Sequence, residues 1–117
     1  MPSTVLIVDD HAAFRTSARA LLEADGFVVV GEAADDREAL DQARVLRPDV
    51  VLLDIQLPDA DGFTVADRLA AEGSGAEVVL VSSHEAATYG PRLATARARG
   101  FIAKRNLSGA ALAALLS

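Results

Sequence analysis

The sequence predicts an α/β fold in which helices cover both faces of a five-stranded parallel sheet. Two observations lead to this prediction. Five short apolar runs, most of them rich in β-branched residues, are spread along the 117 residues, and segments with helical periodicity separate them. The runs are continuous rather than alternating, which is typical of strands buried on both faces. Strands that alternate with helices favour right-handed crossovers and therefore a doubly wound parallel sheet.

The apolar runs define the expected strands in chain order. They cover residues 5–8, 27–30, 50–53, 78–81 and 101–103. Amphipathic helices are expected over 12–24 and 35–46, where apolar residues recur on one side, and a third over 61–72. Ser108 is a helix-capping residue and precedes a last segment rich in Ala and Leu. A chain of 117 residues is long enough for one core but too short for two domains of ordinary size, and it shows no linker, so we expect a single domain over 1–117.

The segment 85–99 is less regular than the other helical segments. Gly90-Pro91 falls inside it, and proline inside a helix removes a backbone hydrogen bond. Proline is tolerated as the first residue of a helix, where its missing N–H has no partner in any case. We therefore expect a short helix from about Pro91 onward, preceded by a mobile loop.

Composition limits the classes of function. The chain contains no cysteine, which excludes disulfides and thiolate metal sites and favours an intracellular setting. No apolar stretch approaches the roughly 20 residues that cross a bilayer, so we expect a cytoplasmic protein without membrane association. The formal net charge of -6 argues against direct nucleic-acid binding by this chain alone.

The charge is unevenly distributed along the chain. Residues 91–117 contain no acidic residue and five basic ones, Arg92, Arg97, Arg99, Lys104 and Arg105. This asymmetry predicts a basic C-terminal face that binds an acidic or phosphate-bearing partner, with an affinity that falls as salt rises.

Acidic residues follow two of the expected strands. Asp9 and Asp10 come directly after the first strand, and Asp54 follows the third. If these strands are neighbours, three carboxylates converge at the edge where parallel sheets bind ligands. Close carboxylates raise one another's pKa, and a divalent cation relieves the repulsion. Oxygen ligands suit magnesium or calcium, and magnesium fits a shallow site that also receives a phosphate.

Two further polar side chains follow the remaining strands. Ser82 ends the fourth strand, and Lys104 follows the fifth. The alternation of strand faces favours Ser82 over the adjacent Ser83 as the residue that faces the site. With a metal present, Asp54 can supply an attacking oxygen while Lys104 and Ser82 hold oxygens of a transferred phosphoryl group. The sequence has no phosphate-cradling Gly-rich loop and no His base beside a nucleophilic serine, so phosphoryl acceptance is the favoured chemistry.

Four sequence blocks together resemble the signature blocks of response-regulator receiver domains. They are VLIVDDH at 5–11, VVLLDIQLPDADG at 50–62, VVLVSS at 78–83 and GFIAK at 100–104. The resemblance covers essentially the whole chain and implies a flavodoxin-like fold with strand order 2-1-3-4-5. The DDH block and the ending AKRNLSGAALAALL look most like receivers that carry a helix-turn-helix output domain.

The resemblance also implies a role for each matching residue in the acidic site. Asp54 is similar to the phosphoacceptor, and Asp10 to a direct ligand of Mg²⁺. Asp9 is similar to an acid that acts mainly through metal-bound water. Gln56 matches the position whose backbone carbonyl completes the metal shell. A sensor histidine kinase would donate the phosphoryl group from a phosphohistidine, which makes the chain a phosphoacceptor rather than an enzyme.

The remaining matches concern the response to phosphorylation. Ser82 is similar to the switch hydroxyl, Lys104 to the family's active-site lysine, and Phe101 to the aromatic residue that changes exposure on activation. The implied output is an altered C-terminal face that contacts an output domain, a partner protein or, on phosphorylation, a second copy of the chain. Two positions depart from the usual pattern: Arg105 stands where many receivers have proline, and Gly90-Pro91 interrupts the helix of the output face.

Several alternative interpretations remain open at this stage. Asp9-Asp10 also fits a plain helix cap, and Phe101 also fits a simple core residue. A degenerate receiver could serve as a binding module without phosphorylation. A phosphatase with an aspartyl-phosphate intermediate is a further rival, but it needs an acid where this chain has Gln56. His11 and His84 are interpreted as lying outside metal chemistry, because neither has a second ligand at helical spacing.

Overall fold

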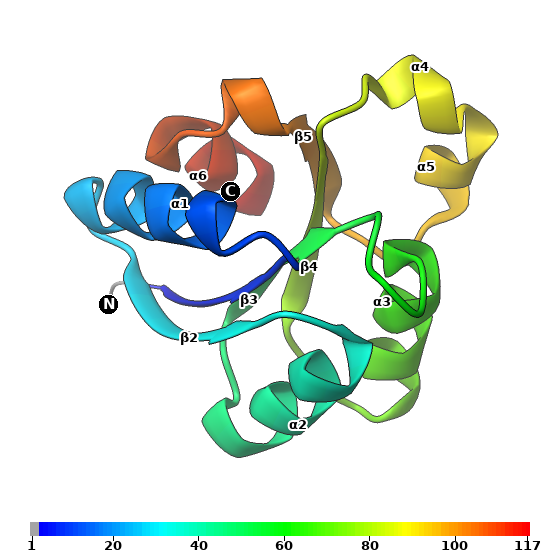
Figure 1. Cartoon of the computed structure of the whole chain (residues 1–117), viewed down its shortest axis with the longest axis horizontal. Coiled ribbons are helices and arrows are strands. Elements are labelled where there is room, and N and C mark those ends of the chain that lie inside the picture. The colour runs from blue at the N-terminus through cyan, green and yellow to red at the C-terminus, as the bar shows by residue number, and fades with distance from the viewer. Residues whose placement is uncertain (1–2) are drawn as a thin grey trace.

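The computed structural model describes residues 3–117. Figure 1 shows a twisted sheet with helices on both faces, and its strands are all parallel in the order β2-β1-β3-β4-β5. The strands are β1 (Thr4–Val8), β2 (Val28–Ala33), β3 (Val50–Asp54), β4 (Glu77–Ser82) and β5 (Gly100–Ala103). This arrangement confirms the predicted fold class and strand order.

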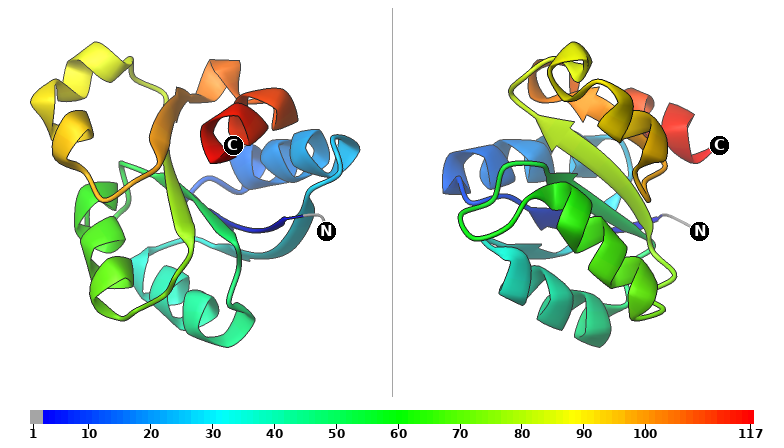
Figure 2. Two further views of the ribbon diagram at one scale, coloured as in Figure 1. Left: turned by 180° about the vertical axis from the view of Figure 1, so that it is seen from behind. Right: turned by 90° about the vertical axis from the view of Figure 1, so that its right-hand side faces the viewer.

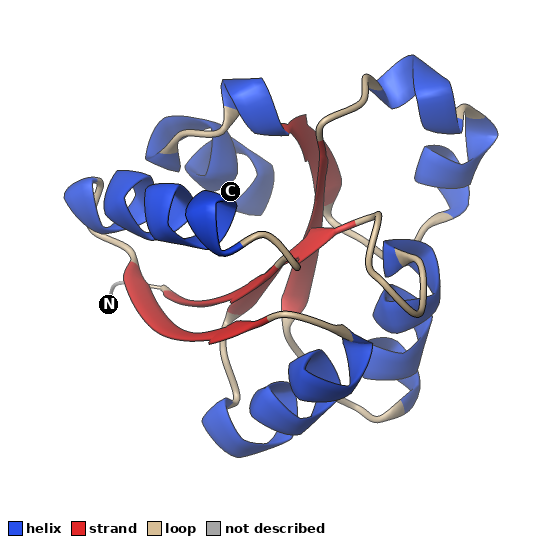
Figure 3. Ribbon diagram, in the orientation of Figure 1, coloured by secondary structure: helices blue, strands red, loops and turns tan. Residues whose placement is uncertain are grey.

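The helices form a layer on each face of the sheet, as the two views of Figure 2 and the blue ribbons of Figure 3 make clear. In chain order they are α1 (Ala12–Ala24), α2 (Asp36–Leu46), α3 (Gly62–Ala71), α4 (Ala86–Tyr89), α5 (Pro91–Thr95), the 3₁₀ turn η1 (Lys104–Asn106) and α6 (Gly109–Leu116). Helices α1 and α6 cover one face, and α2, α3, α4 and α5 lie on the other. No helix within residues 3–117 combines the length and the hydropathy needed to traverse a bilayer.

Strand β1 lies inside the sheet and contributes to both cores. Its side chains alternate in direction, so Leu6 and Val8 pack on the α2 side, while Val5 and Ile7 pack on the α1 side. All four are fully buried. A strand with both faces covered needs apolar residues at every position, which explains the continuous apolar run.

Strand β2 differs from its predicted limits. It begins at Val28 rather than Phe27 and continues through Gly31 and Glu32 to Ala33. The extension follows from pairing, because β1 runs on to Val8, which lies opposite Ala33. A change of register between Val5 and Leu6 of β1 accommodates one extra residue of β2. The sequence pattern ended where the apolar residues ended and therefore missed this half of the strand.

The segment before Pro91 also differs from its prediction. The expected mobile loop is wrong, because residues 86–89 form the single helical turn α4. Gly90 then adopts φ 54° and ψ -133°, a backbone conformation that favours glycine, and Pro91 begins α5 as predicted. The segment is therefore divided into two short helices.

Candidate functional site

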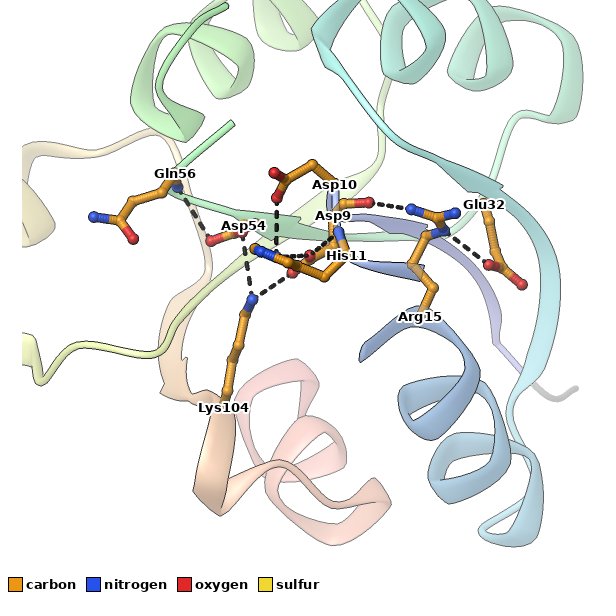
Figure 4. Close-up of polar contacts among 8 residues, drawn as sticks. All are labelled: Asp9, Asp10, His11, Arg15, Glu32, Asp54, Gln56 and Lys104. Carbon is orange, nitrogen blue, oxygen red and sulfur yellow. Dashed lines mark hydrogen bonds and ion pairs between the residues drawn. The ribbon is translucent and has the colours of Figure 1, made fainter. Parts of the chain in front are cut away.

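Asp9 lies at the carboxyl end of β1 and is fully buried. Its amide donates to the carbonyl of Ala33 at 3.0 Å, and its own carbonyl accepts a 2.6 Å hydrogen bond from the guanidinium of Arg15. Arg15 is held in turn by Glu32 of β2, at 3.0 Å. Figure 4 shows the contacts of Asp9 with Arg15 and of Arg15 with Glu32 to the right of the acidic cluster. The backbone of Asp9 is thus fixed from two sides, which directs its carboxylate into the site.

Asp54 is the last residue of the adjacent strand β3 and is only 3% exposed. Its Oδ1 accepts the Gln56 amide at 3.1 Å. The following loop returns directly beneath it, because the Gly62 amide donates to the Ile55 carbonyl at 2.7 Å. A Cβ atom at Gly62 would lie 2.7 Å from the Asp54 carbonyl oxygen, so only glycine permits this approach.

Lys104 brings a positive charge to the two buried carboxylates, as Figure 4 shows. Its Nζ lies 2.6 Å from Asp9 Oδ2 and 3.4 Å from Asp54 Oδ2, and it is 4.4 Å from the centre of the Phe14 ring. Burial alone lowers the pKa of Lys104, but its contacts with Asp9 and Asp54 outweigh burial and raise that pKa. Lys104 is therefore protonated at neutral pH.

The pKa of Asp54 is raised to about 6. Burial is the main cause, and the negative charge of Asp9 adds to it, whereas the Gln56 amide and Lys104 act in the opposite direction. The contacts of Asp54 with Gln56 and Lys104 therefore offset only part of the effect of burial on its pKa. A further cation would favour the ionised form of Asp54.

The donor atoms present fit a divalent cation. Asp9, Asp10, His11 and Asp54 each offer one atom, and these atoms all lie within 4.8 Å of one another. Asp9 Oδ2 is buried and, within residues 3–117, has no hydrogen bond of acceptable geometry, although Lys104 Nζ is close enough for an ion pair. The Asp10 side chain is 33% exposed, which leaves the cluster open to solvent. A buried carboxylate oxygen with spare acceptor capacity, beside two others, is suited to a hard metal ion.

His11 lies against the acidic cluster, a contact that the sequence analysis did not predict; its place outside metal chemistry stays a prediction. Its Nδ1 lies 3.2 Å from Asp9 Oδ1 and 3.1 Å from Asp10 Oδ1, as Figure 4 shows. The sequence-based prediction considered only spacing along a helix and did not anticipate this contact. Here the turn before α1 folds the imidazole back over the two preceding acids, and the Asp9 carboxylate also accepts the His11 amide at 2.8 Å.

Ser82 and Ser83 have different environments at the end of β4. Ser82 is fully buried and Ser83 is exposed. The Ser82 hydroxyl oxygen accepts the His84 amide at 3.0 Å and shares a 2.6 Å hydrogen bond with the hydroxyl of Tyr89. Sequence reasoning did not find Tyr89. The available signal was that a polar aromatic residue, the only tyrosine of the chain, stands one short helix after the serine.

Phe101 is partly buried on β5 and continues an aromatic row. Its ring centre is 6.1 Å from that of Tyr89, which is 5.9 Å from that of Phe63. Phe101 also lines an apolar pocket of about 240 Å³ with Leu80 and Leu93. The structure therefore joins Ser82 to Phe101 through the ring of Tyr89. Gln56 is exposed, and its backbone forms an isolated bridge with Asp61.

Each of the five basic residues expected on the C-terminal face has a polar partner in the fold. Arg92 pairs with Asp61 at 3.1 Å, and Arg97 lies 3.7 Å from Asp67. Arg105 pairs with Glu85. Arg99 binds the backbone carbonyls of Leu115 and Ser117, and Lys104 lies in the acidic cluster. Acids from earlier in the sequence thus lie beside three of these arginines in the fold. Binding of an acidic partner by this face stays a prediction.

Comparisons with known proteins agree with this geometry. The model of the response regulator receiver domain matches residues 5–116. The response regulator GacA of Pseudomonas viridiflava is 39% identical over 113 residues, which are 96% of this chain and 51% of that protein. A LuxR-family two-component response regulator of Aurantimonas is 28% identical with a TM-score of 0.86, covering 99% of this chain and 86% of that one. The response regulator domain of Thermotoga maritima CheB is 26% identical with a TM-score of 0.85, covering 99% and 95%.

Proposed function

This chain belongs to the response regulator receiver family of two-component systems, and we propose from this premise that it accepts a phosphoryl group on Asp54 from a sensor histidine kinase. The observation that carries the proposal is the environment of Asp54. It is a buried carboxylate with a pKa raised to about 6, beside Asp9 and within reach of Lys104. A divalent cation would stabilise the ionised, nucleophilic form of this carboxylate and would offset the further negative charge of an aspartyl phosphate.

The residues of this site have distinct tasks in the proposed transfer. Asp9, Asp10 and the backbone carbonyl of Gln56, together with Asp54, would hold Mg²⁺. When bound, that ion would neutralise phosphoryl oxygens and favour in-line displacement. The ammonium group of Lys104 would contact a transferred oxygen, and the Ser82 hydroxyl would donate to another. The ion pairs of Lys104 with Asp9 and Asp54 support this role for Lys104.

The proposed step forms one bond and breaks another. An oxygen of the Asp54 carboxylate attacks phosphorus of the kinase phosphohistidine, and the P–N bond breaks with its electron pair going to the imidazole nitrogen, which takes up a proton. The product is an aspartyl phosphate, which carries close to two negative charges at neutral pH. The chain is thus a phosphoacceptor that assists its own phosphorylation and loss of phosphate, and not an enzyme acting on a separate organic substrate.

Phosphorylation would be transmitted through Ser82 and Phe101. Movement of Ser82 toward the phosphoryl group leaves space on the side of β5 where Phe101 lies, so a charge change becomes a change of packing. The kinase biases an equilibrium between the two arrangements. The row of rings from Phe63 to Phe101 and the pocket beside Phe101 support this route.

The wider setting follows from the relatives. The chain spans about half the length of the curated relatives that it matches, including GacA. We propose that its single receiver domain acts in the cytoplasm on a transcription-regulating output domain or partner protein, and that phosphorylation favours a homodimer. Binding of nucleic acid would then be a property of the output domain, because this chain has a net charge of -6.

Mass spectrometry after treatment with acetyl phosphate and Mg²⁺ tests the proposal. We expect one phosphoryl group per chain in the wild type and none in Asp54→Asn. An unmodified wild type would contradict phosphoryl acceptance and favour a degenerate receiver. Sustained release of phosphate from phosphomonoesters would instead favour a phosphatase.

A further inference from the structure

Tyr89 connects the buried serine to the aromatic row on the α4 side of the sheet. Its hydroxyl oxygen lies 2.6 Å from Ser82 Oγ. Its ring packs against Phe63 on one side and Phe101 on the other, with centre-to-centre distances of 5.9 and 6.1 Å. The ring is therefore held from both sides, and its hydroxyl is presented to Ser82 with little freedom.

The hydrogen bonds of Ser82 favour the orientation seen in this structure. A serine hydroxyl has one hydrogen and can accept through two lone pairs. Ser82 Oγ accepts the His84 amide and bonds Tyr89, and within residues 3–117 it makes no hydrogen bond to Asp54 or Lys104. If Ser82 donates to Tyr89, its only hydrogen is engaged. If Tyr89 donates, the second lone pair is engaged and the same orientation is held.

We propose that Tyr89 is a positioning residue that holds Ser82 in its unphosphorylated orientation. This inference rests on the proposed function, because it concerns the Ser82 hydroxyl that would contact the phosphoryl group. Phosphorylation must replace the Tyr89 hydrogen bond with one to a phosphoryl oxygen. Tyr89 therefore stabilises the unphosphorylated form relative to the phosphorylated form, and its release frees the ring that packs against Phe101.

The position of Tyr89 in the backbone supports this assignment. It is the last residue of α4, and the next residue, Gly90, has a positive φ and precedes Pro91. The chain thus turns immediately after Tyr89, which allows its side chain to point back toward β4. In an uninterrupted helix, residue 89 would lie in the helix interior, and the regular backbone geometry would fix the direction of its side chain.

The substitution Tyr89→Phe tests the hydroxyl without removing the ring. We expect it to bind Mg²⁺ with beryllofluoride, a phosphate mimic, about 2- to 10-fold more tightly than the wild type in calorimetric titration, which corresponds to loss of one hydrogen bond in the free form. In a Ser82→Ala background the same substitution should change the affinity by less than about 2-fold, because the partner is absent. Equal effects in both backgrounds would show that Tyr89 acts through packing and would overturn the proposal.

The wild type offers a second measurement that needs no variant of Tyr89. The chain has one tyrosine and no tryptophan, so its near-ultraviolet absorbance reports this phenol. We expect Mg²⁺ with beryllofluoride to shift the tyrosine band in the wild type and to leave it nearly unchanged in Ser82→Ala. An identical shift in both proteins would contradict the assignment.

These outcomes separate the two proposals. A wild type that does not bind beryllofluoride with Mg²⁺ contradicts phosphoryl acceptance and, with it, the role of Tyr89. A wild type that binds, together with an unchanged affinity in Tyr89→Phe, contradicts only the role of Tyr89.

Discussion

Lys104 Nζ lies 2.6 Å from Asp9 Oδ2, at the centre of a cluster that contains more acidic than basic groups. The two residues come from opposite ends of the sequence and meet because β1 and β5 both end at this edge of the sheet. Asp9 is fully buried, whereas the Lys104 side chain is 17% exposed. The ion pair therefore extends from the buried interior of the cluster to its solvent-accessible edge.

Replacing Lys104 tests how strongly it compensates the acids. Lys104→Met removes the cation while retaining much of the aliphatic stem, so Asp9 and Asp54 would repel each other without a counter-ion. We expect a loss of about 1–3 kcal/mol in the free energy of unfolding, discounted for partial exposure. Urea unfolding would measure it, and added Mg²⁺ should restore part of the loss. Arg105→Met, at the exposed neighbouring position, should change stability by less than about 0.5 kcal/mol.

The raised pKa of Asp54 predicts how stability depends on pH. The folded protein retains a proton on Asp54 up to about pH 6, whereas the unfolded chain releases it near 3.8. Folding is therefore favoured by this group at low pH, and that contribution is lost as pH rises from about 4 to 6. Asp54→Asn removes the dependence and should stabilise the metal-free protein at pH 7 by about 1–3 kcal/mol.

Unfolding curves of both proteins between pH 4 and 8 would test this, with the difference between them as the readout. The difference cancels the contributions of carboxyl groups that both proteins share. One of these is Glu32: burial raises its pKa, but Arg19 and Arg15 outweigh burial and lower it. A constant difference across this range would contradict the assignment of the shift to Asp54.

Asp10 is expected to affect metal binding more than folding. Its side chain is 33% exposed and lies within the acidic cluster. Asp10→Asn should weaken Mg²⁺ binding by about 10-fold or more, because it removes an anionic ligand, and should change metal-free stability by less than about 1 kcal/mol. Isothermal titration with Mg²⁺ and urea unfolding without metal provide the two measurements. Asp59→Asn, an exposed acid outside the cluster, serves as the control.

Gly62 is expected to be required for the position of Asp54. In Gly62→Ala the new Cβ would meet backbone atoms, the Asp54 carbonyl oxygen at 2.7 Å and Ile55 Cα at 2.8 Å. Backbone cannot rotate away, so we expect a loss of about 1–3 kcal/mol and weaker Mg²⁺ binding. Gly31→Ala is the matched control, since its close contact at 2.6 Å is the end of the Leu46 side chain, which can move. A smaller loss in Gly62→Ala than in Gly31→Ala would refute this explanation.

The fold was predictable because apolar periodicity and strand burial have the same physical cause. Every strand-forming run became a strand, and residues such as Leu6 and Ile7 are buried on opposite faces as the continuous pattern requires. The second half of β2 was not predictable in this way. Pairing with β1 extends this strand through Glu32, whose charge is met by Arg15 and Arg19 of α1. No local sequence pattern predicts ion pairs between separate elements.

The residues of the candidate site likewise fall into a predictable group and an unpredictable one. Asp9, Asp54 and Lys104 were expected to meet because each follows a strand of a parallel sheet, and topology alone determines where strands end. The contacts of His11 with the acids and of Tyr89 with Ser82 were not predicted, because they depend on how a turn and a helix end direct one side chain. The neutralised arginines were missed for a related reason, since Asp61, Asp67 and Glu85 become their neighbours only in the folded chain.

The junction at Gly90 has a mechanical consequence. Pro91 offers no amide hydrogen, and the nearest backbone bonds, from the Gly90 amide to Ala86 and from the Leu93 amide to Gly90, are both long at 3.3 Å. Rotation about the backbone bonds of Gly90 can therefore change the angle between α4 and α5 without breaking a backbone hydrogen bond inside either helix. A partner bound to both α4 and α5 would therefore contact two helices joined by a hinge. A single continuous helix could change this surface only by bending or by shifting along its axis.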